Sequence, residues 1–204
     1  MIFNLEPKHS PGKDTHAYWD DFLTPEDLNL ILASPVWHEL AKGRVGGVGG
    51  DGCLNGNIDK NVRNTDICWW APNQENYHIW QKFSNVVSEI NTKYFKYDLT
   101  GFYEPAQLGL YTGNEQSHYK WHVDGSAKDR NVPRKLSMVL MLSDTSEFEG
   151  GELQIKTETD DIIFLEQKKG RAWFFPSYIL HRVTPVTQGV RRSLVLWVGG
   201  PEFK

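Results

Sequence analysis

Cysteine is scarce in this sequence, and long hydrophobic runs are missing from it. The 204 residues include two cysteines, Cys53 and Cys68, which form neither a disulfide framework nor a metal-binding motif. We expect ordinary reduced thiols, with a disulfide between them as the minor alternative. No apolar stretch approaches the roughly 18 residues of a transmembrane helix, and the first residues lack the pattern of a secretory signal. These features predict a cytoplasmic protein without a membrane segment.

An excess of positive charge is also lacking. The 22 lysine and arginine residues are outnumbered by 26 aspartate and glutamate residues, which gives a formal net charge of -4. Phosphate-dominated binding usually leaves a basic footprint, so this balance argues against nucleic acid as the obligatory partner. One local cluster, formed by Lys128, Arg130, Arg134 and Lys135, has two interpretations: a solvated loop, which we favour, or a contact with an anionic substrate.

A glycine-rich stretch at residues 42–59 lacks the Gly-Lys-Ser/Thr ending of a phosphate-binding loop. It also lacks a strand-turn-helix context, so we do not expect a nucleotide cradle. We predict a mobile loop, which either closes over a substrate and excludes water or is a simple surface excursion.

The length favours one domain, residues 1–204, with an N-terminal extension over 1–97 and a core over 98–198. Thr24 and Pro25 carry the signals of a helix start, and this helix should run to about Ser34. A second helix is predicted within residues 74–95, because apolar residues recur there at spacings of three and four. They form one stripe that should pack on the outer face of a sheet: Trp80, Phe83, Val87, Ile90 and Tyr94.

Short strands alternate with turns from residue 98 onward. Their number and rhythm fit a double-stranded β-helix, or jelly roll, of the cupin-like kind, within a mainly β fold with flanking helices (α+β). Gly150-Gly151 is predicted to be a hairpin turn. The predicted strands are 99–103, 106–112, 119–123, 135–143, 151–156, 161–165, 171–175, 179–184 and 190–198.

Three residues have the chemistry and spacing of a metal site. His122 and Asp124 are separated by one residue, so on a strand both side chains point to the same face. With His181 they offer two imidazoles and one carboxylate, which leave three positions open on an octahedral ion and suit Fe(II) and dioxygen. Closed structural zinc sites leave none. Taken alone, His122 could instead be a buried, hydrogen-bonded histidine and Asp124-Gly125 a hairpin turn.

The last predicted strand carries two adjacent arginines on opposite faces. Arg191 shares its face with Ser193, whereas Arg192 points the other way. The planar fork of arginine binds carboxylates bidentately and stays charged when desolvated, and a serine hydroxyl can add a further donor. We therefore predict that Arg191 is the anion-binding residue and Arg192 a solvated charge.

Taken together, these segments resemble the Fe(II)/2-oxoglutarate-dependent dioxygenases, and within them the prolyl-4-hydroxylase-like group with its PKHD-type hydroxylases. The resemblance extends over roughly residues 100 to 198, about half of the chain, and lies in the order and spacing of the motifs. The matching segments are Gln107–Tyr111, Trp121–Asp124, Arg134–Ser143, Glu149–Ile155, Phe175–Ser177, His181–Thr187 and Arg191–Ser193.

The resemblance implies a role for each matching residue. Iron would be held by His122, Asp124 and His181. Arg191 would pair with the distal carboxylate of 2-oxoglutarate, and with the three iron ligands it would make up the catalytic residues. Ser193 and Tyr111 would assist Arg191 in the cosubstrate site.

Substrate contacts are implied as well. The stretch from Arg63 to Trp70 resembles the family's substrate-side strand, which makes these two residues candidate substrate contacts. Collagen-type prolyl hydroxylases carry lysine at the position of Arg191, so a collagen-like substrate is not expected.

The implied activity is hydroxylation of an unactivated C–H bond by Fe(II), 2-oxoglutarate and O2, with release of succinate and CO2. A prolyl residue of a protein or peptide is the substrate that the resemblance favours, and ascorbate is a further cofactor that it allows. Three alternatives stay open: a hydroxylase of a free amino acid or other small molecule, a nucleic-acid demethylase, and a jelly-roll protein that binds Zn or Mn without oxygenase activity.

Overall fold

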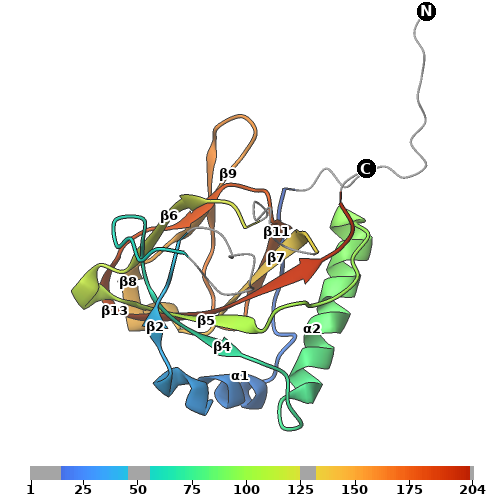
Figure 1. Cartoon of the computed structure of the whole chain (residues 1–204), viewed down its shortest axis with the longest axis horizontal. Coiled ribbons are helices and arrows are strands. Elements are labelled where there is room, and N and C mark those ends of the chain that lie inside the picture. The colour runs from blue at the N-terminus through green and yellow to red at the C-terminus, as the bar shows by residue number, and fades with distance from the viewer. Residues whose placement is uncertain (1–14, 46–55, 125–131, 203–204) are drawn as a thin grey trace, which may run out of the picture.

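The computed structural model describes residues 15–45, 56–124 and 132–202, and places two sheets of antiparallel strands face to face (Figure 1). Most of the predicted loop at 42–59 lies outside the described residues. The same holds for Cys53 and for Lys128 and Arg130 of the cationic cluster. None of the helices in the described part of the chain is long and apolar enough to cross a membrane.

The larger sheet has the strand order β1-β11-β7-β13-β5-β4-β2, and β8 also pairs with β13. The smaller sheet has the order β10-β9-β12-β6-β3. This is the jelly roll that the strand rhythm predicted. The strands of the larger sheet are β1 (Ala17–Trp19), β2 (Ala41–Lys42), β4 (Asp66–Trp70), β5 (Ala106–Thr112), β7 (Arg134–Met141), β8 (Phe148–Gly150), β11 (Ala172–Pro176) and β13 (Val186–Gly199). Those of the smaller sheet are β3 (Arg63–Asn64), β6 (His118–His122), β9 (Leu153–Lys156), β10 (Ile162–Leu165) and β12 (His181–Val183).

Two α-helices of the described chain cover the outer face of the larger sheet (Figure 1). The sequence predicted both helices, and it predicted this packing for the second. Helix α1 (Pro25–Leu32) begins with a capping box, in which the Thr24 hydroxyl accepts from the Asp27 N–H and the Asp27 carboxylate accepts from the Thr24 N–H. Helix α2 (Tyr77–Ile90) continues as a π-helical turn (Asn91–Phe95). Shorter 3-10 turns lie at Pro35–His38, Gly113–Glu115 and Thr145–Glu147.

The larger sheet separates two hydrophobic clusters. Its outer face packs on the stripe of α2 predicted from the sequence, and the buried residues there include Phe83, Ile90, Leu108 and Leu194. A second cluster lies between the two sheets. Because successive side chains of a strand point to opposite faces, every central strand contributes to both clusters. The inner face also forms part of the wall of a cavity.

Two local predictions are corrected by the structure. Residues 99–103 form no strand; a single bridge joins Gly101 to Gly199. Gly150-Gly151 is not a hairpin turn, because β8 pairs with β13 whereas β9 pairs with β10 and β12. Both glycines have positive φ, 73° and 60°, and they carry the chain from one sheet to the other.

Candidate active site

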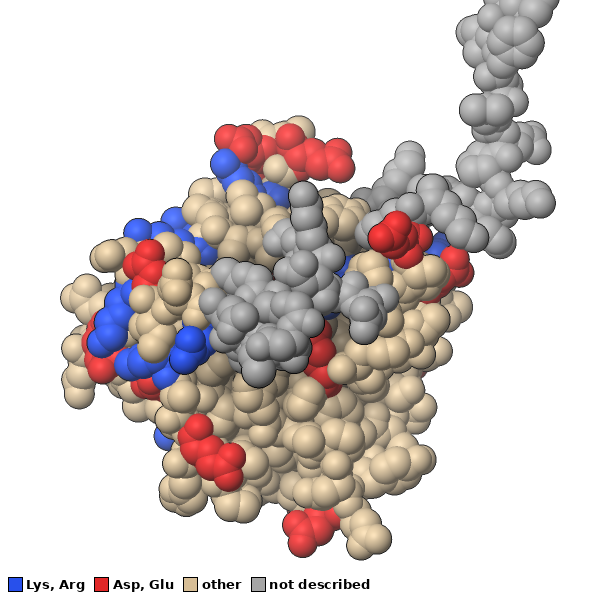
Figure 2. Space-filling model, in the orientation of Figure 1, with Lys and Arg blue, Asp and Glu red and all other residues tan. Residues whose placement is uncertain are grey.

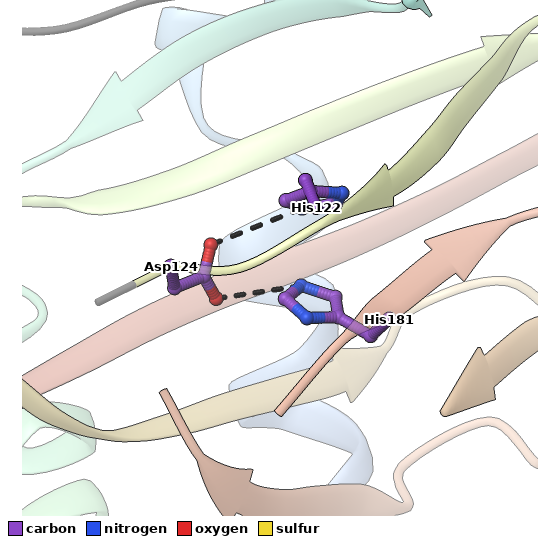
Figure 3. Close-up of side chains that lie close together, drawn as sticks. All are labelled: His122, Asp124 and His181. Atoms are coloured by element: carbon purple, nitrogen blue, oxygen red, sulfur yellow. Dashed lines mark ion pairs between the residues drawn. The ribbon is translucent and has the colours of Figure 1, made fainter. Parts of the chain in front are cut away.

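His122, Asp124 and His181 come together inside the jelly roll (Figure 3). His122 ends β6 and His181 begins β12, and the two residues are register partners in the smaller sheet. Asp124 Oδ1 lies 3.9 Å from His122 Nε2, and Asp124 Oδ2 lies 3.5 Å from His181 Nε2. The three possible ligand atoms lie within 4.8 Å of one another, so a single ion could contact all of them.

Both imidazoles are oriented for metal binding through Nε2. His122 Nδ1 lies 2.7 Å from the Lys120 carbonyl oxygen, and His181 Nδ1 lies 2.9 Å from the Ile179 carbonyl oxygen. A carbonyl can only accept, so each Nδ1 carries the proton and each Nε2 keeps its lone pair for a ligand bond. This orientation of metal-binding histidines by a second hydrogen bond is common in proteins.

Asp124 reaches the site from outside the strand that was expected to carry it. Strand β6 ends at His122, and the backbone N–H of Asp124 donates to the Ser177 carbonyl oxygen at 2.8 Å. The Ser137 hydroxyl, on β7, donates to Asp124 Oδ2 at 2.8 Å and lies 2.9 Å from the Ser177 hydroxyl. The carboxylate is therefore fixed by the larger sheet, although its neighbour His122 belongs to the smaller one.

The electrostatics of the three residues favour a cation between them. Burial, reinforced by the nearby His181, lowers the pKa of His122 to about 3, so the imidazole is neutral near pH 7. Burial alone would raise the pKa of Asp124, but His181, His122 and Arg134 outweigh it and hold that pKa at about 2. Asp124 is thus a carboxylate and His122 a neutral imidazole, the forms in which these side chains bind metals.

Arg191 is a buried cation on the wall of the same cavity. Only 1% of the residue is exposed, and burial lowers the pKa of its guanidinium. Arg191 Nε donates to Gln167 Oε1 at 2.9 Å, and Nη1 donates to Ser193 Oγ at 3.2 Å. Its Cζ lies 5.0 Å from the centre of the Tyr111 ring. The described part of the chain places no carboxylate within ion-pair distance of this arginine.

The cavity has a volume of about 590 Å³ and joins the histidines, Asp124 and Arg191. All four residues predicted to share the Arg191 face of the last strand line it: Arg191, Ser193, Val195 and Trp197. Arg192 points away, and its half-exposed side chain lies 3.7 Å from Glu147. Tyr111 and Arg63 also line the cavity.

Trp70, predicted as a substrate contact, is not in the cavity. It packs in the outer cluster, where its ring stacks on Trp80 at 5.9 Å. Trp69, the next residue back, faces the cavity instead. Strand alternation gives the reason: Ile67 and Trp69 point inward from β4, whereas Cys68 and Trp70 point outward.

Several cavity residues were missed in the sequence. Gln107 lies on β5, two residues from Gly109 and four from Tyr111, so the period-2 rule could have placed it. The Tyr119 ring stacks on the His122 ring at 3.5 Å between centroids. Arg134, predicted as part of a loop cluster, instead pairs with Glu104 (Nε to Oε1, 2.7 Å) and lies over the Trp197 ring.

Comparison with known proteins adds sequence relatives over the same part of the chain. Residues 106–199 match the 2OG-Fe(II) oxygenase superfamily. A PKHD-type hydroxylase of Synechococcus sp. (strain CC9605) is 41% identical over 80 residues, which are 39% of this chain and 36% of that protein. One from Janthinobacterium sp. (strain Marseille) is 34% identical over 115 residues, 53% of this chain and 49% of that protein. The matches thus span less than half of these relatives.

Solved structures share the fold over about nine-tenths of the chain. A prolyl-4-hydroxylase of Pseudomonas putida superposes with a TM-score of 0.69 at 20% identity, over 92% of this chain and 94% of that one. A prolyl hydroxylase of Trichoplax adhaerens, in complex with a hypoxia inducible factor peptide, also gives 0.69, at 16% identity over 92% and 84%. The sequence matches therefore confirm the resemblance to the Fe(II)/2-oxoglutarate-dependent oxygenases and to their PKHD-type hydroxylases, and the prolyl hydroxylase structures confirm the shared fold.

Proposed function

We propose that this protein is an Fe(II)- and 2-oxoglutarate-dependent dioxygenase that hydroxylates a prolyl residue of a protein or peptide. The observation that carries the proposal is Arg191, a buried cation without a carboxylate partner among the described residues, in the same cavity as a His-Asp-His cluster. An unpaired buried charge is costly. An anionic cosubstrate that also reaches the metal would offset this cost.

The donor set fits Fe(II). His122, Asp124 and His181 would hold the ion, as two imidazoles and one carboxylate do in non-haem iron oxygenases. When bound, iron supplies the activation of dioxygen, coupled to conversion of 2-oxoglutarate to succinate and CO2. The chain's own contribution is to fix the three donor atoms, through the carbonyls of Lys120 and Ile179 and the hydroxyl of Ser137.

Arg191 would hold the far carboxylate of 2-oxoglutarate. The fork of the guanidinium suits two carboxylate oxygens, and the Ser193 hydroxyl lies beside it. Tyr111 is the direct cross-strand partner of Arg191, and Gly109 is that of Ser193. A Cβ atom at Gly109 would lie 3.3 Å from the Tyr111 ring and 3.4 Å from Ser193 Oγ, so glycine keeps this end of the site open.

Apolar side chains complete the walls between these groups. Val139, Leu153, Val183 and Val195 line the cavity, and they make the space around the charged ends less polar. Electrostatic interactions are stronger in such a medium than in bulk water.

Prolyl hydroxylation rests on similarity to the prolyl-4-hydroxylase-like group. The single domain over 1–204, the cytoplasmic location and the expectation that nucleic acid is not the obligatory partner also remain predictions.

The first test is uncoupled turnover, in which succinate is measured after air is admitted to anaerobically loaded Fe(II) protein with 2-oxoglutarate. We expect succinate that depends on iron and that is lost in His181→Ala. Binding of 2-oxoglutarate without succinate would mean that the primary substrate triggers oxygen activation. If neither 2-oxoglutarate binding nor succinate is found, the protein is a jelly-roll metal binder and the proposal is wrong.

A further inference from the structure

We propose that Arg63 binds a carboxylate of the primary substrate, so that the molecule hydroxylated in this cavity carries a negative charge close to the reacting C–H bond. This inference rests on the proposed function, because it assigns Arg191 to 2-oxoglutarate and Asp124 to iron. It concerns the second buried arginine of the cavity, which neither of those ligands uses.

Arg63 resembles Arg191 in its environment. The residue is 8% exposed and lines the cavity from β3. Its Nη2 donates to Gln107 Oε1 at 2.6 Å, and Nε is buried without a hydrogen-bond partner. Its Cζ lies 4.5 Å from the centre of the Tyr119 ring. No carboxylate among the described residues lies within ion-pair distance of this guanidinium.

The other deep charges of the cavity are already compensated. Lys42 Nζ lies 3.0 Å from Asp66 and 2.5 Å from Glu115, and Arg134 pairs with Glu104. With iron on Asp124 and a dianionic cosubstrate on iron and Arg191, Arg63 is the buried cation of the cavity that has no carboxylate partner among the described residues.

The surroundings of Arg63 add positive potential. Arg44 lines the same cavity, and its Nη1 donates only to the Gly56 carbonyl oxygen among the described residues. Figure 2 shows several lysine and arginine side chains, with acidic side chains among them, on the side of the molecule where Figure 1 labels β2, β6 and β8. A charged cleft of this kind attracts anions.

The hydrogen bond from Arg63 occupies the acceptor oxygen of Gln107 and leaves the amide donors of Gln107 for a ligand. Because Gln107 Oε1 accepts from Nη2, the amide Nε2 of Gln107 can only donate. Together, the guanidinium and this amide present N–H groups to the cavity. A carboxylate offers an acceptor oxygen to each and compensates the charge. A neutral carbonyl would satisfy a donor but leave the cation unpaired.

The position of Arg63 fixes where the substrate carboxylate would lie. Arg63 packs on Tyr119, and Tyr119 stacks on the iron-ligand candidate His122. A Cβ atom at Gly43 would come within 2.5 Å of Arg63 Nε, so the backbone of Gly43 closes one side of the guanidinium. A carboxylate held here is close to the metal. It is either the α-carboxylate of a C-terminal prolyl residue, or the acidic side chain beside the target residue of a peptide.

Matched probe pairs separate charge from shape. Protein loaded with redox-inert Zn(II) and saturated with 2-oxoglutarate is titrated calorimetrically with N-acetylproline and with its amide, and then with the acetylated, amidated dipeptides Pro-Glu and Pro-Gln. We expect wild type to prefer the acidic member of one pair by about tenfold or more, as charge-assisted hydrogen bonds are stronger than neutral ones. The pair that shows the preference identifies the source of the carboxylate.

Three variants locate the preference. Arg63→Gln should abolish it, and Gly43→Ala should weaken it by displacing the guanidinium without removing its charge. Arg182→Gln is the matched control, because Arg182 lies over Trp121 and donates to Gln154 outside the cavity lining; it should leave the preference unchanged. Binding of 2-oxoglutarate to each variant, measured first, shows that the site is intact.

Three outcomes would overturn the inference while leaving the proposed function in place. Wild type could bind both members of each pair equally, it could bind none of the probes, or its preference could survive Arg63→Gln. Tighter binding of a phosphorylated oligonucleotide than of all four probes would also overturn it, in favour of a nucleic-acid substrate. If wild-type protein did not bind 2-oxoglutarate at all, the proposed function would be wrong, and this inference would fail with it.

Discussion

The two faces of the larger sheet differ in chemistry although the same strands build them. Along β13, Arg191 and Ser193 point into the cavity, whereas Leu194 and Leu196 point into the layer between sheet and helices. The inner face holds polar groups whose partners are ligands, and the outer face holds the apolar area that stabilises the fold. Residues one position apart therefore carry different tasks, and substitutions on the two faces should separate ligand binding from stability.

The largest effect should come from the metal cluster. We predict that Asp124→Ala abolishes both iron binding and iron-dependent succinate formation, because the only carboxylate of the donor set is lost. His118→Ala, on the same strand but outside the cavity lining, is the control and should retain both. Iron content after gel filtration and succinate yield measure the outcome. Normal turnover in Asp124→Ala would show that the reaction is catalysed elsewhere.

The adjacent arginines give the sharpest comparison of the two faces. Arg191→Ala should weaken 2-oxoglutarate binding by about 3–5 kcal/mol, roughly a hundredfold to a thousandfold or more, because one partner of a buried ion pair is removed. Arg192→Ala should change it by less than about 1 kcal/mol, since this side chain is half-exposed and makes a surface pair with Glu147. Calorimetric titration of both variants with 2-oxoglutarate measures these affinities. A larger loss in Arg192→Ala than in Arg191→Ala would contradict the assignment of Arg191 to 2-oxoglutarate.

The outer face should respond in stability alone. Leu194 is fully buried in the cluster beneath the helices. We predict that Leu194→Ala lowers the free energy of unfolding by about 2–5 kcal/mol, through lost apolar burial and the cavity left behind. The folded fraction should bind 2-oxoglutarate with wild-type affinity. Chemical denaturation and titration on one preparation test this, and a parallel loss of affinity would mean that the two faces are coupled.

Ser137 links the inner face to the metal ligands. It is fully buried on β7, and its hydroxyl donates to Asp124. We expect Ser137→Ala to reduce the affinity for Mn(II), used as a stable probe for iron, by about 10–100-fold, as for other residues that orient metal ligands. Ser143→Ala is the matched control, because this buried serine donates to the Val190 carbonyl oxygen instead. Equal metal affinities in both variants would leave Ser137 with a packing role only.

Much of this division could be read from the sequence, because alternation along a strand is a local property. The inward face of β13 and the apolar stripe of α2 follow from periodicity. The same alternation shows that Trp69 and Trp70 of β4 lie on opposite faces, so only one of them can face the cavity. The family resemblance gave residues 63–70 a role without specifying a face.

Contacts between distant segments could not be predicted. The backbone of Asp124 is held by Ser177, and Arg63 meets Gln107, 44 residues further along the chain. Within the described chain no carboxylate lies within ion-pair distance of Arg63, and this depends on how the sheets are stacked, which no short motif encodes. The pairing of β8 with β13 was missed for the same reason, since three residues carry too little periodicity to mark a strand.

The smallest effect should come from the carboxylate of Asp27, in the layer between the helices and the sheet. Its substitution should change the free energy of unfolding and leave the cavity unchanged. Asp27 is 4% exposed. Its carboxylate completes the α1 cap and contacts Lys82 at 2.5 Å and His78 at 3.1 Å, both on α2. Burial would raise the pKa of Asp27, but the bond from Lys82 and those from Thr24 outweigh it and lower that pKa.

A carboxyl group with a lowered folded-state pKa stabilises the protein above its unfolded pKa, near 3.9, and loses this contribution as pH falls through the folded value. We therefore predict that Asp27→Asn lowers the free energy of unfolding by roughly 1 kcal/mol near neutral pH. The gap to wild type should stay constant from about pH 5 upward and close below about pH 4. Denaturation curves across this range measure the gap, with 2-oxoglutarate affinity as the internal control. A gap that persisted at low pH would mean that Asp27 acts through packing and not through its charge.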